Sequence, residues 1–335
     1  MAGSLFFAAR IIFVRRSYAL PKGGEAVAKL RGAAALLFPV FFGAALLFFP
    51  DVSATAAREG VTLCLQTVLP SLFPFFVLSS LLVQSDVPRL LSRAMAGVMY
   101  PLFGVSGAGA SALILGLLGG YPVGARTVAE LYGRGEIARE EAEQLLAFCN
   151  NSGPGFFLGV CGTAVFGSAR AGAYLYLIHV GAALVTGILL RRDLGLPRRK
   201  AVSRQRAPFD LAAALPAAVQ GSFAAVGSVS AFVIFFMVLL RLLSLVPALA
   251  ALPPLPRAAL FGFMEMTNGV NALPATRTGF VLCAAIMNWG GLSVQAQTRA
   301  MLAGSALSAR RCVIGKAVQA LAGVPLALLA AGRLF

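Results

Sequence analysis

The chain has 335 residues, of which 59% are hydrophobic and only 12% are charged, whereas a soluble domain carries about twice that charged fraction. Several apolar stretches of roughly 18 or more residues contain few charges, so the composition excludes an ordinary soluble fold and predicts an all-α polytopic membrane protein. The formal net charge of +16 does not indicate nucleic-acid binding, because the basic residues flank apolar segments instead of interleaving with aromatic residues.

The chain begins with a basic segment, residues 1–31, whose apolar run from Ile11 to Val14 is too short for the core of a signal peptide. We expect this segment to be an arm on the cytoplasmic side, because lysine and arginine favour that side and bind anionic lipid. Residues 32–49 are apolar and predict one extra transmembrane helix before a first repeat over residues 61–190.

The first repeat contains predicted spans at about Val61–Val83, about Leu145–Phe166 and Ala171–Leu190. Between the first two, Pro101–Ala125 is apolar but is interrupted by glycine, proline and polar residues. The linker at residues 191–210 is strongly basic and is therefore expected in the cytoplasm, like the N-terminal arm. Because an even number of crossings must separate two cytoplasmic segments, Pro101–Ala125 is predicted to be a re-entrant hairpin that enters and leaves on the same side.

The second repeat, residues 211–335, follows the same order. Its predicted spans lie at about Phe223–Val246, about Gly279–Val294 and Val313–Ala331, and its hairpin at Pro256–Pro274. Each repeat has an odd number of crossings, so the second is inverted, and the chain is predicted to have about seven transmembrane helices plus two re-entrant hairpins. Four basic residues before or within the last span are expected on the cytoplasmic side: Arg299, Arg310, Arg311 and Lys316.

Two motif matches support this internal repeat. Gly120–Gly124 of the first hairpin corresponds to Glu265–Gly269 of the second, and Ala147–Gly153 of one broken span corresponds to Ala285–Gly291 of the other. In each repeat the second motif follows the first by roughly two dozen residues. The matches occur in the same order in both halves, which is what an internal duplication produces.

Interrupted helices within a membrane leave backbone groups that protein, water or a solute must satisfy. We therefore predict a solute-binding site where the four interruptions meet. The candidate binding residues are Gly120, Tyr121, Pro122, Gly124 and Arg126 in the first hairpin, Asn150, Asn151, Ser152 and Gly153 in the first broken span, Thr267 and Asn268 in the second hairpin, and Asn288, Gly290, Gly291, Ser293 and Gln295 in the second broken span. The alternative is structural: close helix packing at glycines and hydrogen bonds around kinks.

Two titratable residues require separate consideration. Glu265 is the only acidic residue after Asp210, and an ionisable group in an intramembrane hairpin predicts a coupling or gating role. The alternative is a structural ion pair with Arg277 or Arg126. His179, the only histidine, is better explained by one structural hydrogen bond than by proton transfer.

No enzymatic machinery is visible in the sequence. The spans contain no phosphate-binding loop, nucleophile elbow or carboxylate pair, so we expect no catalytic residues, no cofactor and no metal site. The five cysteines are scattered, which predicts neither disulfides nor a metal cluster. The charged stretch from Arg126 to Glu143 is expected to form a solvated cytoplasmic helix pair.

Several motifs together resemble a known family. Leu69–Phe76, Gly119–Arg126, Asn151–Pro154, Glu265–Gly269 and Trp289–Gln295 are similar, in this order, to the sporulation integral membrane proteins of the YlbJ and SpoVV type, which belong to the nucleoside-recognition (Gate) group. The similarity covers roughly the part of the chain from residue 61 to residue 331.

This resemblance implies a role in sporulation. It implies an integral membrane protein of the mother-cell-derived outer forespore membrane that moves dipicolinic acid, a small anion. In such a protein Arg126 could pair with one carboxylate, while Asn150, Asn151 and Asn288 could meet the ring nitrogen or the oxygens. A carrier of nucleosides or of another small solute and a non-transporting scaffold for spore assembly remain alternatives. The expected partners are the lipid bilayer and this solute, and a homo-oligomer is compatible with the sequence.

Overall fold

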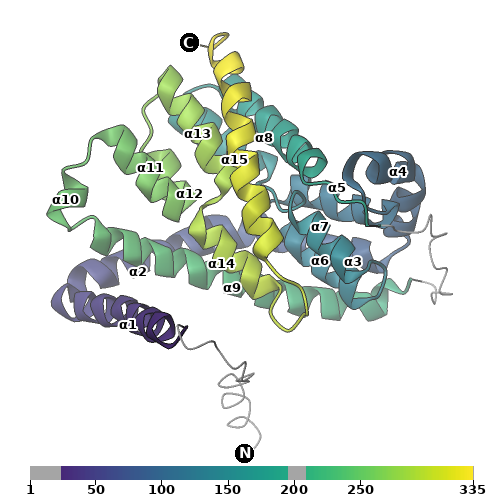
Figure 1. Cartoon of the computed structure of the whole chain (residues 1–335), viewed down its shortest axis with the longest axis horizontal. Helices are drawn as coiled ribbons and strands as arrows, with labels where there is room; N and C mark the ends of the chain where they lie inside the picture. The colour runs from purple at the N-terminus through teal and green to yellow at the C-terminus, as the bar shows by residue number, and fades with distance from the viewer. Residues whose placement is uncertain (1–23, 195–208, 335) are drawn as a thin grey trace, which may run out of the picture. The chain divides into compact units, whose positions relative to one another are not determined.

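The structure, a computed structural model, describes residues 24–194 and 209–334, and the described residues contain helices but no β-strand (Figure 1). It divides into two units, residues 1–50 and 51–335. The first unit contains α1, Gly24–Phe48, which begins within the predicted basic arm. Most of that arm, and most of the predicted linker at residues 191–210, lie outside the described residues.

The second unit begins with a long helical stretch. Helix α2 (Pro50–Leu63) continues through a π-helical segment, η1 (Cys64–Val68), into α3 (Leu69–Gln84). A widened turn fits this place, because a proline follows at position 70 and its ring has no N–H to donate to the preceding turn. Helix α4 (Val87–Phe103) then ends at Gly104, whose positive φ of 68° terminates the helix.

The interruption predicted in the first hairpin is present. After a short 3₁₀ turn, η2 (Gly107–Gly109), come α5 (Ala110–Gly119) and α6 (Val123–Gly133), which pack against each other on either side of Gly120. Gly120 has a φ of 81°, a conformation that glycine adopts without steric cost. The second arm runs eight residues beyond the predicted end at Ala125, to Gly133.

The first broken span is also present, but it is not one helix. It consists of α7 (Arg139–Leu146) and a π-helix, η3 (Phe156–Val165), separated by irregular chain that contains Asn150–Gly153. The interruption predicted within Leu145–Phe166 is therefore present, because polar residues and Gly-Pro-Gly interrupt the backbone hydrogen bonds there. Helix α8 (Ala169–Leu189) follows, with the Ser168 side chain accepting from the Ala171 N–H at its start.

The second half has the same order of elements. Its helices are α9 (Leu211–Leu243), α10 (Pro247–Ala250), α11 (Pro254–Met264), α12 (Met266–Asn271), α13 (Arg277–Trp289), α14 (Gly291–Met301) and α15 (Arg310–Ala331). Helix α9 begins 12 residues before the predicted Phe223, because Asp210 caps its N-terminus with hydrogen bonds to two backbone N–H groups. Gly290 and Gly291, both with positive φ, separate α13 from α14.

Fewer helices can cross a membrane than the sequence predicts. By length and composition, the described residues contain four candidate spans, formed by α8, α9, the α13–α14 pair and α15, or up to six if each of two bent helix pairs is one span. One bent pair joins Val87–Phe103 to Gly107–Gly119 at 101°. The expected count of about seven is not reached because two predicted crossings contain only short apolar helices, Leu72–Gln84 and Phe156–Val165.

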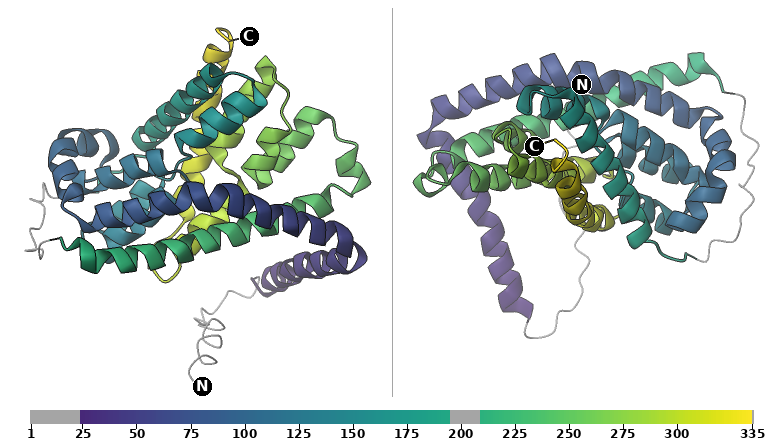
Figure 2. Two further views of the ribbon diagram at one scale, coloured as in Figure 1. Left: turned by 180° about the vertical axis from the view of Figure 1, so that it is seen from behind. Right: turned by 90° about the horizontal axis from the view of Figure 1, so that it is seen from above.

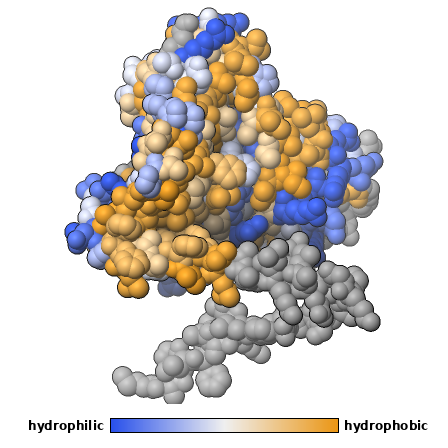
Figure 3. All heavy atoms as spheres, turned by 60° about the vertical axis from the view of Figure 1, so that its left-hand side comes forward, coloured by the Kyte–Doolittle hydropathy of each residue, from blue (hydrophilic) through white to orange (hydrophobic). Residues whose placement is uncertain are grey.

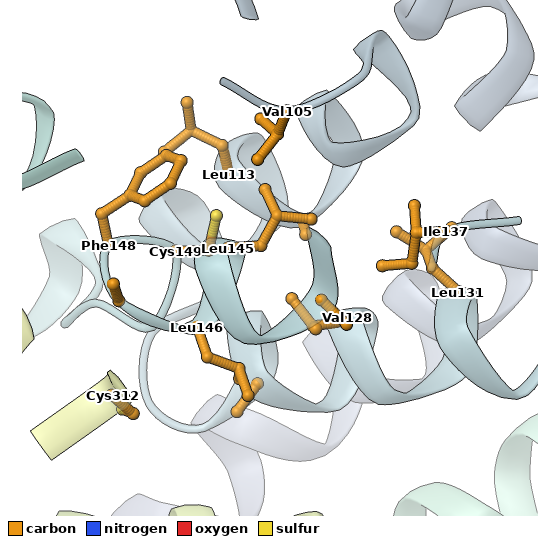
Figure 4. Close-up of a cluster of buried hydrophobic side chains, with 14 of the residues drawn as sticks. Val105, Leu113, Val128, Leu131, Ile137, Leu145, Leu146, Phe148, Cys149 and Cys312 are labelled. Carbon is orange, nitrogen blue, oxygen red and sulfur yellow. The ribbon is translucent and has the colours of Figure 1, made fainter. Parts of the chain in front are cut away.

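The second unit packs around several hydrophobic clusters. Helix α3 lies along α9, and α15 lies against α8 and α13, as the two views of Figure 2 show. One cluster is formed by α5, α6, α7 and the irregular chain after α7; Figure 4 shows Leu113, Val128, Leu145 and Phe148 pointing toward one another. This cluster fixes the first hairpin against the first broken span.

Contacts between the two halves occur in matched pairs. The second hairpin arm of one half, α6, packs against α14, and its counterpart α12 packs against η3. Helix α7 packs against α15, and its counterpart α13 packs against α8. The final helices of the two halves, α8 and α15, pack against each other. Elements that the predicted repeat pairs with each other thus make corresponding contacts.

The surface of the chain is extensively apolar. Figure 3 shows broad hydrophobic areas, and large exposed side chains include Leu177 on α8, Phe223 on α9, and Leu321 and Leu329 on α15, each more than 60% exposed. Such areas are larger than a water-soluble monomer exposes. The chain is an integral membrane protein.

Candidate solute-binding site

A cluster of polar side chains is buried where the two halves meet. We call it the polar centre. Its members come from the irregular chain after α7, the tip of the first hairpin and four helices, and all are at most 6% exposed: Tyr121, Asn150, Asn151, Ser152, His179, Asn288, Thr298, Lys316 and Gln319. Five of them, Tyr121, Asn150, Asn151, Ser152 and Asn288, are sequence-predicted binding residues, so the structure brings together residues from both halves.

Lys316 on α15 is the only lysine, arginine, aspartate or glutamate in the polar centre, and it is fully buried. Its Nζ donates to Asn151 Oδ1 at 3.2 Å and to Gln319 Oε1 at 2.6 Å. It also lies over the ring of Tyr121, 5.0 Å from the ring centroid, in a cation–π contact. That Lys316 lies toward the cytoplasmic side with the neighbouring arginines stays a prediction. The structure shows that its side chain, unlike that of the exposed Arg310, points into the helix bundle.

His179 on α8 belongs to the same cluster. Its Nε2 accepts a hydrogen bond from the Ser152 backbone N–H at 3.1 Å, and Gln319 Nε2 lies 3.5 Å from Nδ1. One structural hydrogen bond was the favoured explanation for this histidine, and the Ser152 contact agrees with it. The bond also places the break of the first broken span directly against α8.

Two asparagines at equivalent positions have an unused acceptor. Asn150 Nδ2 donates to Thr298 Oγ1 at 2.8 Å, and Asn288 Nδ2 donates to the Ala284 carbonyl at 2.8 Å. The Oδ1 atoms of Asn150 and Asn288 are buried and, among the described residues, have no hydrogen-bond partner. A buried amide oxygen without a partner is costly in a protein interior, so both atoms are available to a solute or water.

The tip of the first hairpin closes one side of the polar centre. The Tyr121 hydroxyl donates to the Met287 carbonyl at 3.3 Å, so this tip reaches the end of α13. Gly120 lies directly beside Gly153, with no space for a side chain between the two backbones. Behind the tip, Cβ atoms at Gly116 and Gly124 would overlap the Cys149 carbonyl. Glycine is therefore required for this hairpin to fit against the broken span.

The tip of the second hairpin makes the corresponding approach. A Cβ at Gly291 would lie 3.1 Å from the Glu265 Cα, and Trp289 Nε1 donates to the Phe263 carbonyl at 2.9 Å while its ring stacks on Phe263. The Glu265 carboxylate accepts hydrogen bonds from the backbone N–H groups of Thr267 and Asn268 and from Asn268 Nδ2, at 2.8–3.0 Å. It therefore caps the N-terminus of α12.

Arg126 lies outside the polar centre. Its Nε pairs with Glu130 at 2.9 Å, its Nη1 donates to Ser222 on α9 at 3.3 Å, and its guanidinium lies over the Phe76 ring on α3. The alternative ion pair between Arg126 and Glu265 is therefore absent. The structure places Arg126 between α6, α3 and α9, with partners of its own.

The remaining predicted residues are less central. Ser293 accepts from Gln297 Nε2, and Gln295 donates to the Trp289 carbonyl while its Oε1 is buried without a partner in the described part of the chain. Thr267 and Asn268 contact Glu265 through their backbone N–H groups. These residues support the second hairpin and the second broken span, and no contact joins them to Lys316.

Sequence reasoning missed Lys316, Gln319 and Thr298. A usable signal exists, because Cys312, Gly315, Lys316, Gln319 and Gly323 follow each other at helical spacing along one face of the last span. Gly315 and Gly323 bring this face into direct contact with Ala147 and Asn288. The nearby Arg310 and Arg311 obscured the signal, because beside them Lys316 resembles one more basic residue at the cytoplasmic end of the span.

The charged stretch before the first broken span is less solvated than predicted. Glu141 on α7 is 3% exposed, and its Oε1 accepts from the Ser106 backbone N–H at 2.7 Å. Burial raises the pKa of this carboxyl group above its ordinary value of 4.5, although the bond to Ser106 acts in the opposite direction. Glu143 accepts from Arg139 and from the Ser308 N–H, which ties α7 to the start of α15.

An apolar chain with interrupted helices around a buried polar cluster defines a membrane protein of transporter-like architecture. Residues 65–240 match the Gate family, described as nucleoside recognition. That match covers more than half of the chain, so the protein belongs to the Gate family, whose members are transporter-like membrane proteins and not enzymes.

One relative makes the assignment more specific. The chain is similar to the sporulation integral membrane protein YlbJ of Bacillus subtilis (strain 168), with 29% identity over 302 residues, covering 79% of this chain and 74% of the relative. The resemblance expected from the sequence motifs is thus confirmed. No solved structure matches the chain.

Proposed function

We propose that this protein is a transporter that moves a small anionic solute, dipicolinate, across the outer forespore membrane during sporulation. The observation that carries the proposal is the polar centre: buried polar side chains from both halves gather where the first hairpin tip meets the two broken helices. Polar groups are costly inside a membrane protein and are kept where a polar solute passes. Similarity to a sporulation membrane protein supports the setting.

The proposed architecture is an inverted repeat with two re-entrant hairpins, α5–α6 and α11–α12. The matched contacts between the halves support it, because α6 against α14 and α12 against η3 are related by exchange of the two halves. The repeats correspond to residues 61–190 and 211–335. In this arrangement each hairpin opens to a different side, and both tips meet at the middle of the membrane.

The solute would contact residues from both halves. Asn150, Asn151, Ser152 and Asn288 supply amide and hydroxyl groups. The glycines of the breaks, Gly153 and Gly290, lie against the first hairpin tip, so a solute would reach their backbone once that tip moves away. The polar centre is closely packed, so a solute would enter only after one hairpin tip moves away. The positions of Tyr121 and Glu265 at the tips make these residues the proposed gate.

Glu265 is proposed to act in gating by holding the N-terminus of α12. Its carboxylate satisfies two backbone N–H groups and the side chain of Asn268. A change at Glu265 would release the first turn of α12 and with it the tip of the second hairpin. Whether the first turn of α12 and the tip of the second hairpin are ordered would thereby depend on the Glu265 carboxylate.

Two rival functions make different predictions. A nucleoside carrier would transport an uncharged solute, and the description of the Gate family as nucleoside recognition favours testing it. A scaffold for spore assembly would transport nothing, and it has no need for buried acceptors such as Asn150 Oδ1 and Asn288 Oδ1.

Uptake by reconstituted vesicles separates the three functions. The purified full-length protein is placed in lipid vesicles, and entry of labelled pyridine-2,6-dicarboxylate is compared with entry of labelled uridine. A double variant, Asn150→Leu with Asn288→Leu, serves as the site-defective control, and Asn271→Ala, an exposed position on α12, serves as the matched surface control. Saturable dicarboxylate uptake that only the double variant loses supports the proposal. Preference for uridine indicates the nucleoside carrier, and no flux of either solute favours the scaffold.

A further inference from the structure

Lys316 is an unusual residue in its surroundings. It lies in the first half of α15, a 22-residue candidate span, and it is fully buried beside Gln319, Asn151 and Tyr121. Arg310, at the start of the same helix, is exposed. A lysine near a membrane surface normally extends its ammonium group to water, yet Lys316 instead directs it into the polar centre.

The ammonium group has neutral partners only. Its hydrogen bonds go to two amide oxygens, and its third contact is the ring of Tyr121. Among residues 24–194 and 209–334, no carboxylate forms an ion pair with it. These neutral acceptors give an ammonium group no counter-charge, and an uncompensated buried charge is strongly unfavourable, so an anion that enters would stabilise the charged form of Lys316.

The neighbouring groups supply no counter-charge to an ammonium at Lys316. His179 and Tyr121 are uncharged when they accept from Ser152 and donate to Met287, as they do here. The thiols of Cys149 and Cys312 are the other titratable groups that face Lys316. Glu265, the acidic residue of the second hairpin, is occupied at the N-terminus of α12.

We infer that Lys316 is the residue that binds the negative charge of the solute, by pairing with a carboxylate that enters the polar centre. This inference rests on the proposed transport function and specifies the class of solute, a small carboxylate anion. The carboxylate replaces one of the amide oxygens at Nζ. Asn151 and Gln319, whose Nδ2 and Nε2 atoms are donors, can turn toward the second carboxylate oxygen.

The inference separates anions from neutral solutes. Pyridine-2,6-dicarboxylate and pyridine-2,6-dicarboxamide have nearly the same shape, but only the first carries charge. A site whose affinity depends on Lys316 binds the dicarboxylate more tightly than the diamide, because a charge-assisted hydrogen bond is roughly twice as strong as a neutral one. A site that recognises only the shape and the hydrogen-bonding groups of the solute binds the two compounds about equally.

The test measures equilibrium binding of the two compounds to the full-length protein in detergent. The variants are Lys316→Gln and Lys316→Met, which remove the charge, and Lys316→Arg, which keeps it. Arg310→Gln is the matched control, because it removes one positive charge from the exposed start of the same helix. Thermal unfolding and size-exclusion behaviour show which variants are folded.

We expect the wild-type protein to bind the dicarboxylate at least tenfold more tightly than the diamide, which corresponds to about 1.4 kcal/mol. Lys316→Gln and Lys316→Met should lose this preference, whereas Lys316→Arg and Arg310→Gln keep it. If the neutral variants do not fold, the test is the relative affinity of the wild-type protein for the two compounds. Equal affinity for the dicarboxylate and the diamide then overturns the inference.

The outcomes also distinguish this inference from the proposed function. Dicarboxylate binding and uptake that persist unchanged in folded Lys316→Gln overturn the role of Lys316 and leave the transport function standing. A wild-type protein that binds neither compound and transports neither overturns both. Uptake of the diamide at the rate of the dicarboxylate shows a carrier that does not recognise charge.

Discussion

Asn151 in the break of the first broken span accepts a hydrogen bond from Lys316 in the last helix, with 3.2 Å between Oδ1 and Nζ. The same oxygen accepts from Gln319 Nε2 at 3.1 Å. One amide oxygen thus joins residues that are separated by more than 160 positions in the chain. The irregular segment after α7 is thereby held against the helix that carries the buried cation.

We predict that Asn151→Ala lowers the thermal stability of the detergent-solubilised protein by several degrees. The change removes one buried acceptor that two donors share, although Lys316 Nζ keeps Gln319 Oε1 and Gln319 Nε2 keeps the His179 carbonyl, so we expect a total cost of about 1–3 kcal/mol. The matched control is Asn271→Ala at an exposed position, which should leave the melting temperature nearly unchanged. Equal melting temperatures for the two variants would contradict this account of the Asn151 contacts.

A methyl group at the first hairpin tests its close approach to the broken span. In Gly124→Ala the new Cβ would overlap the Cys149 carbonyl, so the hairpin must shift, at a cost of about 1–3 kcal/mol. Gly133→Ala, at the open end of the same helix, meets nothing within 4 Å and should be neutral or slightly stabilising. The melting temperatures of the two variants provide the comparison, and a Gly124→Ala protein as stable as Gly133→Ala would show that this contact is not close.

Glu265 variants separate the cap of α12 from gating. Glu265→Ala should lower stability by about 1 kcal/mol, because the first turn of α12 loses its acceptor. Glu265→Gln keeps an acceptor oxygen and should stay closer to wild type in melting temperature, while dicarboxylate uptake falls in both variants. Wild-type uptake by Glu265→Gln at every pH tested would exclude the gating role.

Glu141 should give the folded protein a measurable dependence on pH. Because burial raises the pKa of Glu141 in the folded state above 4.5, the folded protein binds more protons than the unfolded chain between the two pKa values. Stability is therefore lost as the pH rises through this window and stays lowered above it. Glu141→Gln does not lose stability in this way. Its melting temperature minus that of the wild type should therefore be higher at pH 7.5 than at pH 4. A difference that does not change with pH would contradict the prediction.

The inverted arrangement predicts that the open ends of the two hairpins face opposite sides of the membrane. Single cysteines at Gly133 and Ala251, both exposed, mark these ends. The native cysteines of the described chain are all buried, so background labelling should be low. A membrane-impermeant maleimide applied to oriented vesicles should label one position from outside and the other only after permeabilisation. Labelling of both from the same side would rule out the inversion.

The sequence was informative wherever backbone conformation is decided locally. The interruptions at Gly120 and at Gly290–Gly291 were predicted because glycine with positive φ ends a helix whatever surrounds it. The number of spans was overestimated, because the periodicity of an apolar run does not show that a π-helix shortens it, as in Phe156–Val165.

Side-chain partners were predicted less well than breaks in the backbone. Lys316 lies in the polar centre because one face of α15 points inward. Gly315 and Gly323 allow that face to approach α7 and α13 closely, which is visible only in the packed structure. Arg126 and Glu265 were both expected at the site, but each finds a local partner within four residues, Glu130 for the arginine and backbone N–H groups for the glutamate. Local capping and a helical ion pair satisfy these charges, and residue spacing along the sequence does not show which of several partners a side chain takes.

Helix α9 contains 33 residues, which at about 1.5 Å per residue gives a rod of roughly 50 Å. The hydrocarbon layer of a bilayer is only about 30 Å thick, so this helix cannot stand upright with its whole length among lipid tails. It must be strongly tilted from the membrane normal, or part of its length must lie among the lipid headgroups. Since α3 lies along it, lipids with shorter or longer acyl chains should act on both helices together, and membrane thickness becomes a variable that sets how this protein sits.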